Sequence, residues 1–560
     1  MLDSKKLLRK KKSIKRELLA QNRDWIDKKI AVLGGSTTNE VVDQIELQLL
    51  FHGIRAEFYQ SEYNRFYEDA VFGNELLDEF KPDVIYIHTN WRNILQFEDL
   101  QTEFGLFKSA WLALKEKFHC PIIQNNFDRP NYRLLGNRDV WDSKARTNFI
   151  FRLNSMLYEF AQSTEDFYIN DIDYLSAEFG LSRWQSSSYW HLYKYAMNLE
   201  AIPLVAKSVA DIIKSIYGKN KKLIALDLDG TLWHGIIGED GVDGIEIGNE
   251  TPSGQLHLEF QKYLKDLQSI GIIFSVNSKN NLPNALAGLN HPDGILKPED
   301  FVSIKANWNS KDRNLVETSE ELSLGLDSFV FVDDTEFERE IVRENLPMVS
   351  VPEFESAEDF LPMLDRSGFF EVTRISKEDL NRTEQYKIKQ QAENFRTQFK
   401  NYDEYLSSLQ MVAEIKKFEP MYFSRITQLV NKTNQFNLTT KRFTESEIRT
   451  MAEDPNFICL QGRLKDRFGD YGIVSLIIGQ IIEEKVSIEL FLMSCRVLNR
   501  RFEDRMMETF FDEVKSRNVT TIIGKYFPTK KNSMVKDLYS KFGFEKVFED
   551  EEKSEWIKKF

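Results

Sequence analysis

LIALDLDGTLW (residues 223–233) joins an apolar run to two carboxylates and a hydroxyl. The first four residues show no polar alternation, which is typical of a strand buried on both faces of a parallel sheet. Asp227, Asp229 and Thr231 follow this strand, and ligands of α/β sheets collect beyond the carboxyl ends of strands. Two carboxylates this close repel each other, so the pattern favours a neighbouring cation over two solvated loop residues.

Two more apolar strands downstream also end in polar groups. IIFSVN is followed by Ser278 and Lys279, whose hydroxyl, ammonium and backbone N–H groups suit a phosphate. SFVFVDD ends in the paired acids Asp333 and Asp334. Between these strands, Lys311 opens a predicted helix. Because the carboxyl ends of parallel strands meet at one sheet edge, we expect these groups to surround one pocket with the first two acids.

This set of residues suits phosphoryl transfer through an aspartyl phosphate. Asp227 can attack phosphorus, while Asp229 donates a proton to the leaving oxygen and later activates water. A magnesium ion and Lys311 can offset the charge on the phosphoryl oxygens. A response-regulator receiver is an alternative with the same chemistry, but in receivers the acidic pair precedes the acceptor aspartate, and here the order is reversed.

The order DxDxT, Ser, Lys, DD over residues 221–352 resembles the haloacid dehalogenase (HAD) superfamily. The resemblance implies a magnesium site whose ligands are the side chains of Asp227 and Asp333 and the backbone carbonyl of Asp229. It implies that Asp334 is a further ligand or a supporting acid. It also implies that the phosphate is bound by Thr231, Ser278 and Lys311.

The likeness extends over nearly the whole chain. LWHGIIGEDG, NWNSK, FVFVDDTEFERE, NKTNQFNLTTKRF and LMSCRV together resemble the FkbH-like branch of that superfamily. The resemblance implies a phosphatase core with flanking domains that takes a phosphoglycerate and passes the glyceryl group to the thiol of an acyl carrier protein. This chain departs at Asn277, where the branch commonly has a cysteine before the motif serine, because an amide cannot form a thioester.

The connection after the first motif is short. Only about 40 residues separate Thr231 from the second strand. They suffice for a predicted hairpin, turning at residues 239–241, and a helix over 254–270, but not for a cap domain. We therefore expect an open pocket that Trp233 and His234 approach, and that admits the tip of a large substrate such as a pantetheine arm.

Upstream, residues 25–218 alternate apolar strands and helices, which predicts a parallel α/β domain. Ser36 at the end of its first strand and His191 late in the domain resemble the serine and histidine of an SGNH hydrolase. The oxyanion donor would come from one of three asparagines: Asn126, Asn125 or Asn90. An SGNH hydrolase has an acid three residues before this histidine, but this chain has Ser188 at that position. The default interpretation is therefore a binding domain in which Ser36 is a turn or helix-cap residue.

The first 24 residues form a basic segment with interspersed leucines. We expect a helix that docks onto the next domain through its leucines; a helix that binds a membrane surface or a polyanion is the alternative.

Residues 371–403 are a predicted helical linker, and residues 404–560 resemble a GNAT acyltransferase through the ending PTKKNSMVKDLYSKFGFE. RVLNRR lacks both glycines of the RxxGxG turn that binds coenzyme A, so recognition of a pantetheine arm suits this region better. The amide-rich segment 431–443 is a predicted ligand loop, unless its asparagines only form turns. The predicted ligand residues here are Asn434, Gln435, Asn437 and Arg496.

Composition restricts the class of protein. The 560 residues carry a net charge of −14, which argues against general nucleic-acid binding. The three cysteines support neither a disulfide framework nor a zinc site. Cys459 and Cys495 have apolar neighbours typical of packed core thiols; for Cys495 the alternative is a thiol that replaces the cysteine absent at position 277. No apolar run reaches membrane-spanning length and the start lacks a signal-peptide core, so we expect a cytoplasmic protein.

The sequence therefore predicts three α/β domains: a Rossmann-like HAD core with a minimal cap at residues 219–370, an SGNH-like parallel domain before it and a GNAT-like α+β domain after it. The predicted function is Mg²⁺-dependent hydrolysis of a small phosphorylated acid or acyl phosphate. Glyceryl transfer to an acyl carrier protein and a non-catalytic carrier-binding scaffold are the alternatives.

Overall fold

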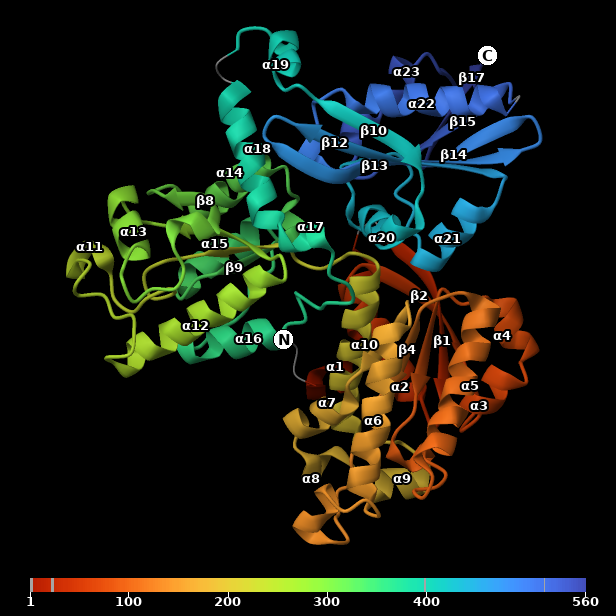
Figure 1. Cartoon of the computed structure of the whole chain (residues 1–560). Helices are drawn as coiled ribbons and strands as arrows, with labels where there is room; N and C mark the ends of the chain where they lie inside the picture. The colour runs from red at the N-terminus through yellow and green to blue at the C-terminus, as the bar shows by residue number, and fades with distance from the viewer. Residues whose placement is uncertain (1–3, 22–24, 397–398, 518) are drawn as a thin grey trace. The chain divides into compact units, whose positions relative to one another are not determined.

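The computed structural model describes residues 4–21, 25–396, 399–517 and 519–560 (Figure 1). The chain forms two compact units. One contains the N-terminal region up to residue 217 with residues 444–447, and the other contains residues 218–443 and 448–560. No helix in the described ranges combines the length and apolarity needed to cross a membrane.

The N-terminal unit is built on a five-stranded parallel sheet in the order β2-β1-β3-β4-β5. Its strands are β1 (Ile26–Gly34), β2 (Ile54–Gln60), β3 (Val84–His88), β4 (Ile122–Asn125) and β5 (Phe167–Asn170). In β1, Ile30 and Val32 pack into one core with helices α2 (Asn39–Phe51) and α10 (Ile202–Ile216). The alternate residues Ala31 and Leu33 pack into the core on the other face, which α5 (Leu100–Phe118) and α6 (Arg146–Ser163) cover. Helices thus cover both faces, as the continuous apolar strands predict.

The basic N-terminal segment forms α1 (Ser4–Leu19), which docks on α2. Leu7 and Leu18 are buried with the α2 residues Leu47 and Leu50. Two lysines of α1 pair with acids of α2: Lys11 Nζ lies 2.7 Å from carboxylate oxygens of both Glu40 and Asp43, and Lys15 Nζ lies 2.6 Å from Glu46. The docked arrangement, held by buried leucines and by two lysines that pair with α2, is therefore the one observed.

The central domain of the second unit is a four-stranded parallel sheet in the order β8-β7-β6-β9. Its strands are β6 (Leu223–Leu226), β7 (Ile273–Ser278), β8 (Phe301–Ala306) and β9 (Phe329–Val332). Every residue of β6 is buried, because Ile224 and Leu226 pack on one face and Leu223 and Ala225 on the other. The helices of this domain are α11 (Ile237–Asp240), α12 (Pro252–Ser269), α13 (Leu282–Leu289), α14 (Lys311–Leu322), α15 (Glu336–Asn345) and α16 (Phe360–Arg366).

The connection between β6 and β7 differs from the predicted hairpin. It is closed by a single antiparallel bridge between His234 and Glu246, and the expected turn at residues 239–241 lies in the short helix α11 and its C-cap. The Asp229 carboxylate explains the difference, because it accepts the Ile237 N–H and so anchors the start of α11. No cap domain is inserted here, as the length of the segment requires.

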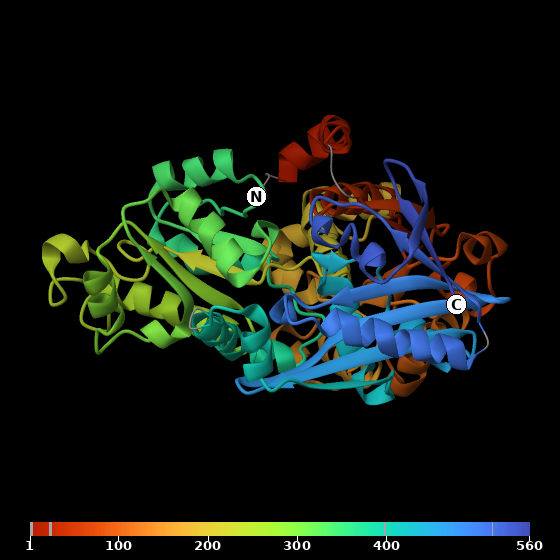
Figure 2. The same cartoon turned by 90° about the horizontal axis from the view of Figure 1, so that it is seen from above.

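The C-terminal region is a largely antiparallel sheet in the order β10-β12-β13-β14-β15-β17-β16, with β11 paired to β14. Its strands are β10 (Val412–Lys417), β11 (Phe436–Asn437), β12 (Phe457–Asp466), β13 (Gly469–Ile482), β14 (Lys485–Met493), β15 (Thr521–Tyr526), β16 (Glu545–Glu549) and β17 (Ser554–Lys559). Among the strand pairs of the described residues in this sheet, only β14–β15 is parallel. Helix α22 (Phe502–Ser516) lies along this sheet, with Met506 and Phe510 in its core (Figure 2). The helices α17 (Lys377–Leu380) and α18 (Arg382–Arg396) precede the sheet, and α20 (Phe423–Lys432) follows β10.

Candidate active site

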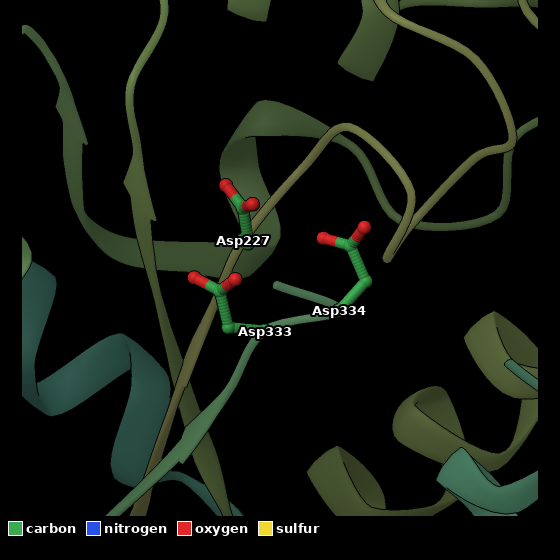
Figure 3. A group of neighbouring side chains, drawn as sticks. All are labelled: Asp227, Asp333 and Asp334. Carbon is green, nitrogen blue, oxygen red and sulfur yellow. The ribbon is translucent and has the colours of Figure 1, made fainter. Parts of the chain in front are cut away.

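The predicted acids meet at the carboxyl edge of the central sheet. Strands β6 and β9 are parallel neighbours with Leu226 opposite Val332, so the residues that follow them, Asp227 and Asp333, lie side by side. The Asp227 N–H donates to the Val332 carbonyl at 3.0 Å and continues this register. Figure 3 shows the carboxylates of Asp227, Asp333 and Asp334 gathered around a common space.

Lys311 neutralises this cluster from the first position of α14. Its Nζ lies 2.9 Å from Asp227 Oδ2 and also donates to Asp333 Oδ2, and all three side chains are buried. Burial alone would lower the pKa of Lys311, but the charges of the two aspartates outweigh it and raise this pKa. Burial, followed by repulsion from Asp227, raises the pKa of Asp333 to about 7. The ammonium of Lys311 therefore opposes the effect that burial and repulsion have on Asp333.

The remaining oxygens suit a hard cation. Carboxylate oxygens of Asp227, Asp333 and Asp334 lie within 4.8 Å of one another. Asp227 Oδ1 is buried and has no hydrogen-bond partner among the described residues, so the fold leaves this oxygen uncommitted. Burial, with repulsion from Asp227, also raises the pKa of Asp334. Three carboxylates with one uncommitted oxygen fit Mg²⁺, which prefers oxygen ligands.

Asp229 is half-buried, and hydrogen bonds to its carboxylate hold it in place. Its Oδ1 accepts from Trp233 Nε1 at 2.8 Å and from the Ile237 N–H at 3.1 Å, and its Oδ2 accepts from Asn280 Nδ2 at 3.0 Å. Burial raises its pKa, which favours the protonated form that a proton donor needs.

Trp233 does not line the pocket, contrary to the expectation. Its side chain is 1% exposed and packs in the core, where its role is to hold Asp229. His234 does lie on the pocket wall.

The pocket is an open cavity of about 720 Å³. Asp227, Asp229, Ser278 and Lys311 lie on its wall together with Asp334. The Thr231 side chain lies elsewhere: it is fully buried, and its hydroxyl accepts the Asp334 N–H at 3.2 Å. The sequence predicted five catalytic or phosphate-binding residues, and four of them lie on the wall of this one cavity. The fifth, Thr231, instead uses its hydroxyl to position the turn that carries Asp333 and Asp334.

Arg339 is a residue of the site that the sequence pattern did not indicate. Its Nη1 donates to the backbone carbonyls of Asp333 at 2.8 Å and Asp334 at 2.7 Å, and its Nη2 donates to the Phe354 carbonyl at 3.1 Å. The buried guanidinium therefore fixes the turn that presents both acids. It lies within the charged run TEFERE, where nothing distinguishes it from a solvated helix residue.

Asn277, which replaces the expected cysteine, is fully committed to structure. Its Nδ2 donates to the Lys311 carbonyl at 2.9 Å, and its Oδ1 accepts from Asn314 Nδ2 at 3.0 Å. Both partners belong to α14, so the amide ties β7 to the helix that carries the active-site lysine.

The predicted second site in the N-terminal unit does not assemble as a triad. Ser36 is buried, and its hydroxyl has no partner among the described residues. His191 lies exposed on α9 (Ser187–Tyr193). Asn126 Nδ2 already donates to Tyr158 Oη at 2.8 Å and to Asp171 Oδ1 at 2.6 Å, which leaves no N–H of this amide for an oxyanion. Hydrolytic chemistry here stays a prediction.

The predicted ligand loop contributes to a second cavity. Asn434, Gln435 and Arg496 lie on its wall, whereas Asn437 is fully buried and accepts the backbone N–H groups of Thr439 and Thr440. Cys495 also lines this cavity and is half-buried, so the expectation of a packed core thiol is wrong at this position. Cys495 begins the short helical turn after β14, residues 495–497, in which Arg496 and Val497 are buried.

Comparisons with known proteins agree with this geometry. Residues 29–214 match the family model described as "FkbH, N-terminal domain". Over this region the chain is similar to the N-terminal domain of FkbH proteins. It is also similar to the crystal structure of the N-terminal part of the protein BF1531 from Bacteroides fragilis, described as containing a phosphatase domain complexed with Mg, with 28% identity and a TM-score of 0.61. That match covers 67% of this chain and 100% of the other.

Weaker similarities involve acetyltransferases. The ribosomal-protein-S18-alanine N-acetyltransferase from Escherichia coli is 13% identical, with 26% of this chain and 91% of that chain covered and a TM-score of 0.21. The PaiA N-acetyltransferase from Thermoplasma acidophilum, solved with coenzyme A, is 15% identical, with coverages of 27% and 99% and a TM-score of 0.20. At these values the likeness supports no functional argument. No curated protein sequence matches the chain.

Gly230 provides a test of the metal site. Its φ is +68°, and an added Cβ would lie 2.5 Å from Asp334 Oδ2. Gly230→Ala must therefore displace this carboxylate, and we expect it to weaken Mg²⁺ binding, measured by calorimetry, about tenfold or more. Gly105→Ala is the matched control, because a methyl group at this position of α5 meets no atom within 4 Å. Equal affinities in the two variants would contradict the assignment.

Proposed function

We propose that this FkbH-like protein hydrolyses a small phosphorylated acid or acyl phosphate through a phosphoaspartate at Asp227. The match to a magnesium-complexed phosphatase-domain protein supports a HAD-like phosphatase. The observation that carries the finer proposal is the uncommitted, buried Asp227 Oδ1 beside Lys311 on the wall of an open cavity.

The residues support a two-step reaction. In the first step Asp227 Oδ1 forms a bond to phosphorus while the bond to the leaving oxygen breaks, and Asp229 gives its proton to that oxygen. In the second step Asp229 takes a proton from water as the water oxygen attacks phosphorus, and Asp227 leaves as a carboxylate. Lys311 Nζ, held between Asp227 and Asp333, offsets charge on the phosphoryl group.

The carboxylates of Asp227, Asp333 and Asp334 would hold a magnesium ion, which when bound polarises the phosphoryl oxygens. Ser278, at the end of β7, lies on the cavity wall where its hydroxyl can donate to the phosphate. Lys279 is a further cation of the wall, 2.5 Å from Glu338, and can meet the carboxylate of an acidic substrate.

A phosphate-release screen over phosphorylated acids and acyl phosphates tests this function. We expect release that needs Mg²⁺ and falls roughly 10⁴-fold or more in Asp227→Asn, because the amide cannot act as the nucleophile. Asp243→Asn, an exposed aspartate on the same connection, is the control and keeps full activity. Metal-independent release, or turnover that survives in Asp227→Asn, would contradict the proposal.

Asp229→Asn separates the two steps. A poor leaving group such as the alcohol of phosphoglycerate needs a proton, so we expect kcat/KM to fall about 10²–10⁴-fold for this substrate. p-Nitrophenol leaves without protonation, so p-nitrophenyl phosphate should give a rapid burst of nitrophenol followed by slow turnover, because the phosphoaspartate lacks a base to activate water. Stopped-flow absorbance measures the burst. An equal loss on both substrates with no burst would show that Asp229 is not the proton donor.

A further inference from the structure

A second cavity of about 300 Å³ lies at the opposite end of the central strands. Lys222, which immediately precedes β6, and Ser328, which immediately precedes β9, are on its wall. The active-site acids follow the other ends of the same two strands. The wall also includes residues of α17, α18 and α20, of the loop before β9, of the segments that follow α20 and β14, and Lys530 and Lys531, all within the second compact unit.

The cavity wall is strongly cationic. Two carboxylates lie on it, Asp327 and Asp379. The cationic residues of the wall number seven: Lys222, Arg382, Arg425, Lys432, Arg496, Lys530 and Lys531. In a protein with a net charge of −14, such an excess of cations around one cavity is a local feature that background composition does not explain.

The two carboxylates are already used by three of these cations. Asp379 pairs with Arg382 and lies 3.3 Å from Lys432 Nζ. Asp327 pairs with Lys531 at 2.6 Å. Lys222 Nζ has the Lys432 carbonyl as an acceptor at 3.3 Å, which is not an ion pair. The wall therefore keeps more positive charge than its own acids balance.

Arg496 is the clearest sign of a missing partner. Its side chain is 8% exposed, and its Nη1 is buried without a hydrogen-bond partner among the described residues. A buried guanidinium is costly unless an anion or acceptor satisfies it. Burial, with repulsion from Arg382, lowers the pKa of Lys222 to about 8, and burial, with repulsion from Arg496, lowers that of Arg382 to about 10.

The other wall residues indicate what accompanies the anion. Asn434, Gln435, Thr433 and Ser494 offer amide and hydroxyl groups, while Phe436 and Met493 provide an apolar side. A volume of about 300 Å³ is at the lower end of small-ligand sites, so it accommodates an anionic group with a short polar organic part. Arginine with clustered lysines is typical of phosphate recognition.

We propose that this cavity is a second anion site, which binds the phosphate group of a small phosphorylated metabolite through Arg496 and the surrounding lysines. The site is independent of the phosphatase reaction proposed above, because none of its residues lies on the active-site cavity.

Cys495 supplies a readout that reports on this cavity alone. It is half-buried on the cavity wall, whereas Cys120 and Cys459 are buried and the active-site cavity has no cysteine. With the full chain in the absence of magnesium, inorganic phosphate should slow the alkylation of Cys495 by iodoacetamide severalfold relative to chloride at equal ionic strength. Peptide mass spectrometry measures the rate at this residue.

Arg496→Gln should lose this protection, and calorimetric titration with inorganic phosphate should show the corresponding site weakened about tenfold or more. Arg501→Gln is the matched control, because this exposed arginine pairs with Asp403 at 2.8 Å outside the cavity, and it should keep the protection. Lys432→Gln provides a second variant of the wall. Absence of protection in the unmodified chain, or equal protection in Arg496→Gln, would overturn the proposal; the first result needs no variant to fold.

Discussion

The active site depends on the ion pairs that the Lys311 ammonium makes with Asp227 and Asp333. Two neighbouring parallel strands deliver these carboxylates to adjacent, buried positions, where their mutual repulsion opposes folding. Removing one partner of a buried ion pair costs about 3–5 kcal/mol, because the remaining charge stays desolvated. Two features of the fold hold Lys311 in place: α14 begins at this residue, and its backbone carbonyl accepts a hydrogen bond from the Asn277 amide.

The same arrangement explains why the site is reactive and not merely stable. Lys311 occupies one oxygen of Asp227 and leaves the other, Oδ1, without a partner among the described residues. Arg339 and Thr231 hold the backbone of the acidic turn, so Asp334 faces the cavity without being neutralised by them. A carboxylate oriented by its neighbours, on the wall of an open cavity and with one uncommitted oxygen, is what nucleophilic attack on phosphorus requires.

The strand ends of the central domain could be predicted because each carries two independent signals, an unbroken apolar run and a polar group directly after it. Strand β8 lacks the second signal and has two half-exposed residues at an edge, so the sequence did not reveal it. Arg339 donates to backbone carbonyls of the turn that carries Asp333 and Asp334, and Asn280 donates to one carboxylate oxygen of Asp229. Such contacts depend on the tertiary fold, so no local sequence pattern predicts them. The hairpin expectation failed for a related reason, since Asp229 captures the start of α11.

The flanking regions show the limit of motif reasoning more strongly. Ser36 and Asn126 have the residue types of a hydrolase, but the asparagine is already used by Tyr158 and Asp171. Conversely, the cationic cavity draws on residues from six separate segments, from Lys222 to Lys531, and the ligand residues predicted from the sequence include only Asn434, Gln435 and Arg496 of its wall. Charges that are dispersed along a chain signal a site only once the fold brings them together.

Reductive trapping tests the central claim most directly. The chain is incubated with acetyl phosphate and Mg²⁺, quenched, treated with borohydride and digested for mass spectrometry. The account predicts homoserine in place of aspartate at position 227, formed only when substrate was present. Unchanged Asp227 under conditions of active phosphate release, or reduction at a different aspartate, would contradict it.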